Sequence, residues 1–392
     1  MVEWKKLGEL GTFENIGTDK KIVEGEDIVT LLNYVDVYHH KYIDSSVPQM
    51  QVSASNKKIS DCTVEKGDIF VTPSSETVDD IGHSSVITET ISNAVYSYHI
   101  MRYRLFEKNM LLSYYINYSF DTDNVKRQIL KKAQGLTRFG LSKDKFASIL
   151  IPIPSLEEQT RIVGILDTFT SAIDNLKEQI AQRRKQYEYY RDQLLDLEGK
   201  PGVEWFELLE LCDYVDYRGK TPSKVDAGIF LVTAKNIRKG YIDYDNSKEY
   251  ISEDDYEEVM HRGKPQIGDV LVTTEAPLGN VAQIDNENIA LAQRVIKYRP
   301  KDERLNSSYL KYILLGSEFQ IRLEKEATGA TAKGIKGSKL HRMHIPLPPL
   351  SEQQRIVSIL DTFEASIQNL EAQLKEREKQ YEYYRNKLLT FE

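Results

Sequence analysis

Two clusters of basic side chains, each on a glycine-bearing loop, are the residues of this 392-residue chain best suited to chemistry. Positions 126–145 carry seven cations against one acid, and positions 327–345 carry four cations and no acid. Lysine and arginine beside threonine hydroxyls and flexible backbone amides are typical contacts to the phosphates of a nucleic-acid duplex. A solvated charged face is the alternative, and recurrence of the pattern favours duplex binding. The predicted contacts are Lys126, Arg127, Lys131, Lys132, Thr137, Arg138, Lys143 and Lys145 in the first cluster, and Thr331, Lys333, Lys336, Lys339 and Arg342 in the second.

Short hydroxyl side chains follow two predicted strands and are further candidates for contacts to bases or phosphates. Each strand is a short β-branched run that begins after a Gly-Asp turn, at Gly67 and at Gly268, and is bounded by a proline. The same hydroxyls could equally be turn residues at the strand ends, and both interpretations stay open. The candidates are Thr72, Ser74, Ser75, Thr273 and Thr274.

No constellation typical of catalysis or of metal binding occurs in the sequence. The stretch 329–336 lacks the spacing of a phosphate-binding P-loop, and no dinucleotide-binding glycine fingerprint follows a strand. The tetrapeptide N-P-P-(Y/F), which resembles the active site of amino-methyltransferases, is also missing. The histidines and the two cysteines lack partners at the spacing of metal ligands. We therefore expect a non-catalytic chain that binds neither a metal ion nor a cofactor of its own.

Composition describes an ordinary soluble protein of two or three domains. The net charge of −8 counts against nucleic-acid binding, but two long segments described below supply most of this acidic excess, so the distribution of charge has to decide. No apolar run is long enough for a membrane span, and the first ten residues lack the apolar core of a signal peptide. Two widely separated cysteines are typical of a reducing compartment. We expect a cytoplasmic protein without a membrane contact.

The elements that must position these residues include a segment that the chain contains twice. Residues 151–195 and 345–389 align without a gap, with 28 of 45 positions identical. Apolar side chains recur at steps of four and three over about five heptads in each copy, which predicts a long helix with a coiled-coil seam. Pro152 and Pro154 prevent the first helix from extending backwards, and Ser155 with Glu158 has the spacing of a capping box. A helix buried in a bundle is the less favoured alternative.

The seam residues of the two copies match one another in type. Arg183 and Arg377 take the same seam position, and a side chain that snorkels out of the seam is favoured over a register-setting or partner-contacting role. The predicted seam and partner-contact residues are Ile162, Leu166, Phe169, Ile173, Leu176, Tyr187 and Tyr190 in the first copy, and Ile356, Leu360, Phe363, Ile367, Leu370, Tyr381 and Tyr384 in the second.

The globular parts repeat one another more faintly than the helices do. V-E-W opens both, at positions 2–4 and 203–205, and Y-I-D occurs at 42–44 and 241–243. In each part a helical stretch, at 109–133 and 307–327, leads through the glycine loop to a short strand and the proline pair. The chain therefore predicts a duplicated α+β fold with mixed sheets. The predicted segments are a globular domain at 1–150, a long helix at 151–198, a second domain at 199–344 and a second long helix at 345–392.

This combination resembles the specificity subunit of a type I restriction–modification system over essentially the whole length. The motifs that carry the resemblance are I-P-L-P-P-L-S-E-Q-Q-R-I-V at 345–357, I-P-I-P-S-L-E-E-Q-T-R-I-V at 151–163, V-E-W at 2–4, R-G-K-T-P at 218–222 and T-G-A-T-A-K-G at 328–334. The first domain departs from the pattern, because R-G-K-T-P has no clear match there.

The resemblance implies two target-recognition domains, each reading one half of a bipartite asymmetric DNA sequence. They are separated by the two helices packed antiparallel, with pseudo-twofold symmetry. It also implies two modification subunits, which bring S-adenosylmethionine and methylate an adenine in each half-site, and two motor-nuclease restriction subunits. The helices would act as a spacer and as the docking site for the modification subunits. A duplicated coiled-coil scaffold without DNA specificity is the alternative, and it would show no salt-dependent binding to DNA.

Overall fold

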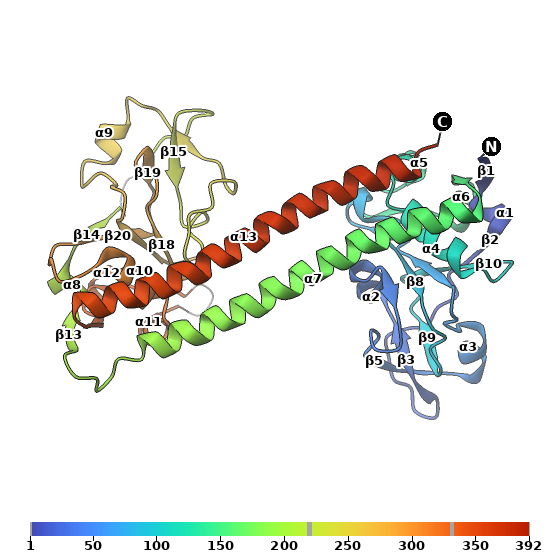
Figure 1. The fold of residues 1–392 in the computed structure, drawn as a ribbon, viewed down its shortest axis with the longest axis horizontal. Helices are drawn as coiled ribbons and strands as arrows, with labels where there is room; N and C mark the ends of the chain where they lie inside the picture. The colour runs from blue at the N-terminus through green and yellow to red at the C-terminus, as the bar shows by residue number, and fades with distance from the viewer. Residues whose placement is uncertain (1, 218–221, 330–332, 392) are drawn as a thin grey trace. The chain divides into compact units, whose positions relative to one another are not determined.

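The computed structural model describes residues 2–217, 222–329 and 333–391 and divides into two compact units. Unit 1 comprises Met1–Lys177 and Ala372–Glu392, and unit 2 comprises Glu178–Glu371. Each unit holds one globular domain and half of each long helix, α7 (Leu156–Leu195) and α13 (Leu350–Leu389), which Figure 1 shows as uninterrupted ribbons. The two predicted long helices are confirmed. The compact units cut across the four predicted segments, because each helix contributes to two cores.

Unit 1 is built on a mixed five-stranded sheet in the order β2-β10-β6-β8-β4, in which only the β4–β8 pair is parallel. A second mixed sheet has the order β5-β3-β9, and β1 pairs with β12. The strands are β1 (Glu3–Lys6), β2 (Gly11–Glu14), β3 (Asp27–Leu32), β4 (Tyr42–Ile43), β5 (Met50–Ala54), β6 (Ile69–Val71), β7 (Ser74–Ser75), β8 (Ser84–Ile87), β9 (Ala94–Tyr96), β10 (Met101–Leu105), β11 (Phe139–Gly140) and β12 (Leu150–Ile153). The helices are α1 (Leu7–Leu10), α2 (Tyr34–His39), α3 (Asn56–Asp61), the 3-10 turn η1 (Val78–Asp80), α4 (Met110–Ser119), α5 (Asp123–Lys132) and α6 (Lys143–Ala147).

Unit 2 has the same kind of layers. Its antiparallel sheet has the order β14-β20-β17-β18, a mixed sheet has the order β16-β15-β19, and β13 pairs with β21. The strands are β13 (Glu204–Glu207), β14 (Cys212–Asp216), β15 (Ile229–Val232), β16 (Tyr250–Ile251), β17 (Val270–Thr274), β18 (Leu278–Gln283), β19 (Ile289–Leu291), β20 (Val295–Pro300) and β21 (His344–Leu347). The helices are α8 (Leu208–Leu211), α9 (Tyr256–Val259), α10 (Ser307–Leu315), α11 (Ser317–Glu326) and α12 (Gly337–Leu340). The predicted duplicated α+β fold is confirmed.

The Gly-Asp turns start the central strands as predicted. Gly67 and Gly268 adopt φ values of +90° and +92°, which glycine reaches without strain. The aspartate that follows each glycine closes the turn, since Asp68 accepts from the amide of Glu65 at 2.9 Å. Asp269 makes the equivalent bond at 2.9 Å in unit 2. β6 and β17 follow these turns directly.

Each predicted helical stretch consists of two helices rather than one. Asn109 caps α4, and Thr122 accepts from the amide of Val125 and so starts α5 as a separate helix. In unit 2 the break lies at Gly316, whose extended backbone ends α10 and precedes α11. The sequence did not reveal these breaks because both sides of each break carry apolar residues.

The first turns of each long helix belong to the core of the domain that precedes it. Ile162 and Leu166 are fully buried in unit 1, where the core also receives Leu389 from the end of α13. Ile356 and Leu360 are fully buried in unit 2. These predicted seam residues therefore pack against a domain as well as against a helix.

No helix among the residues that the structure describes is long and apolar enough to cross a membrane.

Candidate nucleic-acid interface

The structure brings together two sets of candidates that lie about sixty residues apart in unit 1. The glycine loop forms β11, which pairs with β7, so Phe139 faces Ser75 and Gly140 faces Ser74. Gln134 and Gly140 exchange two backbone hydrogen bonds of 3.0 and 2.8 Å and close the loop. The guanidinium of Arg138 donates to the hydroxyl of Ser74 at 3.4 Å. A basic side chain and two half-buried serines thus share one edge of the domain.

Only glycine fits at the start of this loop. Gly135 has a φ of +142°, and a Cβ atom there would lie 1.9 Å from the carbonyl oxygen of Arg138. The tight closure pushes the next three side chains outwards, and Leu136 is 96% exposed. Thr137 and Arg138 stand beside it in solvent. The loop is therefore an exposed tip whose side chains can reach a ligand.

The corresponding loop of unit 2 closes in the same way. Thr328 and Gly334 exchange two backbone hydrogen bonds of 2.9 Å, and Ile335 donates to the carbonyl of Thr274 at 2.9 Å. Lys333 is exposed beside this closure. The predicted contact Thr331 lies outside the described residues, as does most of the R-G-K-T-P motif at 218–222.

Three of the candidate hydroxyls do not reach the surface. Thr72 and Thr273 are fully buried and Thr274 is 3% exposed. Thr72 donates to the carbonyl of Asp80 at 2.9 Å, and Thr274 donates to that of Arg294 at 3.2 Å. Their position agrees with the interpretation as strand-end residues. Among these hydroxyl candidates, Ser74 and Ser75 alone keep partial exposure.

Two lysines of the first basic cluster serve the fold. The ammonium of Lys132 donates to the hydroxyl and the carbonyl of Ser148 at 2.6 and 3.0 Å. Lys145 donates back to the carbonyl of Lys132 at 2.8 Å and ties α6 to the end of α5. Burial lowers the pKa of the Lys132 ammonium below its usual value. The exposed members of the cluster are Lys126, Arg127, Lys131, Arg138 and Lys143.

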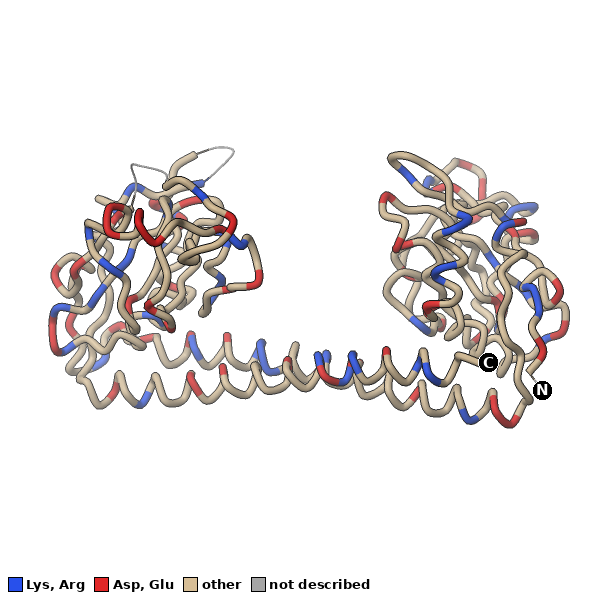
Figure 2. The backbone as a smooth tube through the Cα atoms, turned by 90° about the horizontal axis from the view of Figure 1, so that it is seen from above, with Lys and Arg blue, Asp and Glu red and all other residues tan. Residues whose placement is uncertain are grey.

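The second basic cluster is less positive in space than in sequence. Glu326 on α11 pairs with Lys339 at 2.9 Å, and Glu324 lies 4.0 Å from Lys333. Figure 2 shows basic and acidic positions interspersed along both units. Positions 327–345 themselves hold no acid, but Glu324 and Glu326 from α11 lie beside two of the four cations. Lys336 and Arg342 are the exposed cations of this cluster for which the described part of the chain shows no ion pair.

Sequence reasoning missed a polar cluster beside Ser75. Asp80 accepts from the phenol of Tyr38 at 3.2 Å, lies 3.7 Å from His83 and is within 3.5 Å of the Ser75 hydroxyl. The hydrogen bond from Thr77, together with these neighbours, holds the pKa of Asp80 below its ordinary value. Tyr38 comes from α2 and His83 directly precedes β8, about 45 residues further along the chain, so no local sequence motif indicated this cluster.

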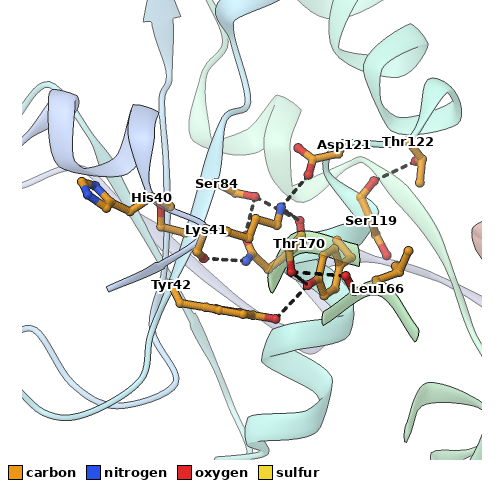
Figure 3. Close-up of polar contacts among 12 residues, drawn as sticks. His40, Lys41, Tyr42, Ser84, Ser119, Asp121, Thr122, Leu166 and Thr170 are labelled. Atoms are coloured by element: carbon orange, nitrogen blue, oxygen red, sulfur yellow. Dashed lines mark hydrogen bonds and ion pairs between the residues drawn. The ribbon is translucent and has the colours of Figure 1, made fainter. Parts of the chain in front are cut away.

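A polar anchor fixes each domain on its long helix. In unit 1 the phenols of Tyr42 and Tyr118 both donate to Oδ1 of Asp167 on α7, the latter at 2.6 Å. Figure 3 shows Tyr42 near Lys41, whose ammonium donates to Asp121 at 2.6 Å. Burial raises the pKa of both tyrosines well above the ordinary value, so they stay neutral donors.

Unit 2 repeats the anchor with different neighbours. The phenol of Tyr312 donates to Oδ1 of Asp361 on α13 at 2.5 Å. Lys311 and Tyr187 both bond to Glu364, at 2.9 and 3.1 Å. The aromatic–aspartate contact is thus common to both units, and the surrounding ion pairs are particular to each.

Inside each unit the two helices run antiparallel and meet through aromatic rings. In unit 1 Phe169 stacks on Tyr384 with ring centroids 5.4 Å apart, and the guanidinium of Arg377 lies 5.8 Å from the Phe169 ring. In unit 2 the equivalent distances are 5.5 Å for Phe363 with Tyr190 and 5.9 Å for Arg183 with Phe363.

These rings lie between the two helices, and Tyr190 and Tyr384 remain 48% and 42% exposed. Of the other predicted seam residues, Ile173 is buried, and Leu176, Tyr187, Ile367, Leu370 and Tyr381 are half-buried. Both seam arginines contact the other helix, so snorkelling alone does not describe them.

Within the described ranges no group of three or more histidine, cysteine, aspartate or glutamate side chains is arranged to hold a metal ion.

Comparison with known proteins identifies the family. The family model described as the type I restriction modification DNA specificity domain matches residues 1–183 and 202–378. A putative type I restriction enzyme specificity subunit of Haemophilus influenzae is 32% identical over 278 residues, 66% of this chain and 68% of the relative. A type I restriction enzyme specificity subunit of Escherichia coli is 33% identical over 263 residues, 62% of this chain and 63% of the relative. Another from Methanocaldococcus jannaschii is 24% identical over 414 residues, covering 96% of this chain and 91% of the relative.

A solved structure supports the fold. The S subunit of a type I restriction–modification system from M. genitalium has a TM-score of 0.56 at 14% identity, covering 100% of this chain and 97% of that one. At this identity the likeness concerns the fold alone. The alignment with the E. coli relative spans somewhat less than two thirds of that protein. The family model, however, covers one domain and adjoining helix twice, and so the chain belongs to the type I restriction modification DNA specificity family.

Proposed function

We propose that this chain is the sequence-specific DNA-binding subunit of a type I restriction–modification complex and performs no catalysis itself. The observation that carries the proposal is the double match of the specificity model, one match for each unit. Each domain would read one half of a bipartite, asymmetric target. Domains of one fold with diverged sequences are suited to this task, since the same scaffold can present different side chains to different bases.

Contact with DNA would use the exposed edge of each domain. The loop tip with Thr137 and Arg138, the neighbouring Ser74 and Ser75, and Lys336 in unit 2 support this assignment by exposure and charge. Phosphate contacts by such cations position a duplex, and base contacts from neighbouring side chains supply the sequence preference. The buried threonines play no direct part in this proposal.

The helices would dock the partner subunits through a surface that occurs once in each unit. The run 185–191 is identical to 379–385 in sequence. Tyr189 is 61% exposed and Tyr383 is 59% exposed, and each makes an edge contact with the next tyrosine at 5.3 and 5.2 Å. Exposed tyrosines beside arginine are typical of the centre of protein interfaces.

Two identical surfaces favour two copies of one partner. These would be the modification subunits, which would carry S-adenosylmethionine and transfer its methyl group, so the cofactor would not belong to this chain. Two restriction subunits would complete a complex that cleaves unmethylated DNA. The long helices would also set the spacing between the two half-sites.

A methylation readout tests the proposal. Cells that express the modification subunit with and without this chain are compared for methylated-adenine motifs, and we expect one bipartite motif that depends on the chain. Replacing residues 1–150 by the first domain of another specificity subunit should change one half of the motif. A swap that alters both halves, or a motif that persists without the chain, contradicts the proposal.

A further inference from the structure

Strands β10 of unit 1 and β20 of unit 2 hold equivalent places in the two central sheets. Each pairs antiparallel with the strand that follows the Gly-Asp turn, so that Tyr103 faces Ile69 in one sheet and Tyr298 faces Val270 in the other. On its other side each strand pairs with the first strand of its sheet, β2 or β14. The residue that precedes each of these tyrosines is therefore equivalent in the two units.

A buried cation occupies this equivalent position in both units, but its surroundings differ. In unit 1 it is Arg102, which is 5% exposed and forms an ion pair with Glu14, the residue opposite it on β2. In unit 2 it is Lys297, which is 4% exposed and faces Val215 on β14. Unit 1 supplies its buried cation with a carboxylate from the neighbouring strand, whereas unit 2 places an apolar side chain there.

The carboxylate beneath Lys297 is already engaged. Both oxygens of Asp269 accept from Arg299, at 2.6 and 2.7 Å, while the Lys297 ammonium lies 3.3 Å away and donates to the carbonyl of Lys264 at 3.1 Å. One buried acid thus serves two cations. Burial lowers the pKa of the Lys297 ammonium, which agrees with an incompletely compensated charge.

Lys297 faces an open pocket of about 370 Å³ along β14, here called the β14 pocket. Among the described residues that form it, the lining holds more cations than acids: Asp213 is the acid of the lining, and Asp269 beneath it pairs with both Lys297 and Arg299. Val215 lies in the lining at the place that corresponds to Glu14. The cations of the lining are Arg262, Lys297, Arg299 and Lys301.

We propose that the β14 pocket binds a phosphate group at the place where unit 1 holds the carboxylate of Glu14. Arginine and lysine donors converge there, and a phosphate offers several charged oxygen acceptors to them at once. The equivalent ion pair in unit 1 shows that an anion fits beside a cation at this point of the sheet. The phosphate comes either from a DNA backbone or from a small free phosphate. The inference rests on unit 2 itself and does not depend on the proposed function.

Thermal unfolding of the full chain in inorganic phosphate and in chloride, at matched ionic strength, tests this inference. Val215→Glu places a carboxylate opposite Lys297, in the same way that Glu14 lies opposite Arg102. The new carboxylate should then occupy the site that we propose for the phosphate. We expect phosphate to raise the Tm of the unaltered chain by about 3 °C and to have little specific effect on this variant. Val225→Glu, the same change elsewhere in unit 2, should keep the full phosphate response.

The variants also separate binding from the general stabilising effect of phosphate on proteins. Lys301→Gln removes an exposed cation of the lining and should reduce the phosphate response without unfolding the chain. This variant therefore tests the proposal even if Val215→Glu does not fold. An equal response of the unaltered chain, Val215→Glu and Lys301→Gln would overturn the proposal. So would the lack of any phosphate-specific shift.

The source of the phosphate is decided in the assembled complex with duplex DNA. If the pocket holds a backbone phosphate, Val215→Glu lowers the slope of log affinity against log salt by about 0.9. An unchanged slope, together with the loss of the thermal response, identifies a free phosphate. If the proposed function is wrong, the methylation motif will not depend on this chain. The effect of phosphate on the Tm of the free chain does not depend on that outcome.

Discussion

The phenol of Tyr118 donates a hydrogen bond to Asp167 on the long helix α7 at 2.6 Å. Tyr312 makes the same bond to Asp361 on α13 at 2.5 Å. Both tyrosine side chains are fully buried. The positions differ by 194 residues in both pairs, the offset at which the long helices repeat. The bond therefore belongs to the duplicated plan of the protein, and it joins each domain to the helix that follows it.

Removing one of these phenols should weaken the domain–helix joint. We expect Tyr312→Phe to lower the free energy of unfolding of unit 2 by about 1–3 kcal/mol, because the buried phenol loses its hydrogen bond to the charged carboxylate of Asp361. Tyr118→Phe should lower that of unit 1 by less, since Tyr42 also donates to Asp167. Denaturant unfolding measures both, and Tyr383→Phe on the exposed surface is the control. Equal effects of Tyr118→Phe and Tyr383→Phe would contradict a structural anchor.

Alkaline pH should destabilise the same joints. Burial raises the pKa of Tyr118 and of Tyr312 above the ordinary value of 10.0. A group that binds its proton more tightly when folded contributes stability below its unfolded pKa, and this contribution is lost as the pH rises above about 10. The free energy of unfolding should therefore fall steeply between about pH 10 and 11. In Tyr118→Phe and Tyr312→Phe this fall should be shallower, and an identical pH profile would speak against it.

Arg138 and Lys132 belong to one basic cluster and should behave differently. Arg138 is exposed on the loop tip, so Arg138→Ala should lower the salt slope of DNA binding by about 0.9 with little loss of stability. Lys132 is held by Ser148, so Lys132→Ala should destabilise unit 1 and leave the slope unchanged. Both variants are measured in the assembled complex at several salt concentrations. If the salt slope of DNA binding falls for Lys132→Ala and not for Arg138→Ala, the DNA does not contact the loop tip.

The repeated tyrosine surface predicts a stepwise change in stoichiometry. Tyr189→Ala and Tyr383→Ala each remove one exposed side chain of the surface proposed to dock a modification subunit. Each single variant should reduce the complex from two modification subunits to one, and the double variant should bind neither. Native mass spectrometry reads the composition, with Leu136→Ala as an exposed apolar control. If the double variant still binds two modification subunits, this tyrosine surface is not their docking site.

Helix length should set the spacer of the DNA target. Inserting seven residues after Lys177 and seven after Glu371 lengthens both helices at the boundary of the compact units by about 10 Å each and keeps the seam register. Because base pairs are stacked about 3.4 Å apart, the methylation motif should gain about three base pairs between unchanged halves. Insertion of four residues at the same places should disturb the seam. A constant spacer would mean that the partners or the DNA position the domains.

The sequence by itself determined the duplication, the long helices, the Gly-Asp turns and the family, because local periodicity or repeated motifs indicate each of them. The ends of elements depended on packing. The first long helix was expected to reach position 198, yet it ends at Leu195, where Leu195 and Leu197 enter the core of unit 2.

The tertiary structure alone decided which candidate residues are free to bind. Thr72 and Lys132 look like surface residues in the sequence, but Thr72 is buried directly after β6 and Lys132 is hydrogen-bonded to Ser148. Glu326 neutralises Lys339 from another helix, and Val215 leaves Lys297 without a carboxylate opposite it. Charge and exposure depend on neighbours that lie far apart along the chain. Only folding brings those neighbours within the few ångströms over which ion pairs and hydrogen bonds act.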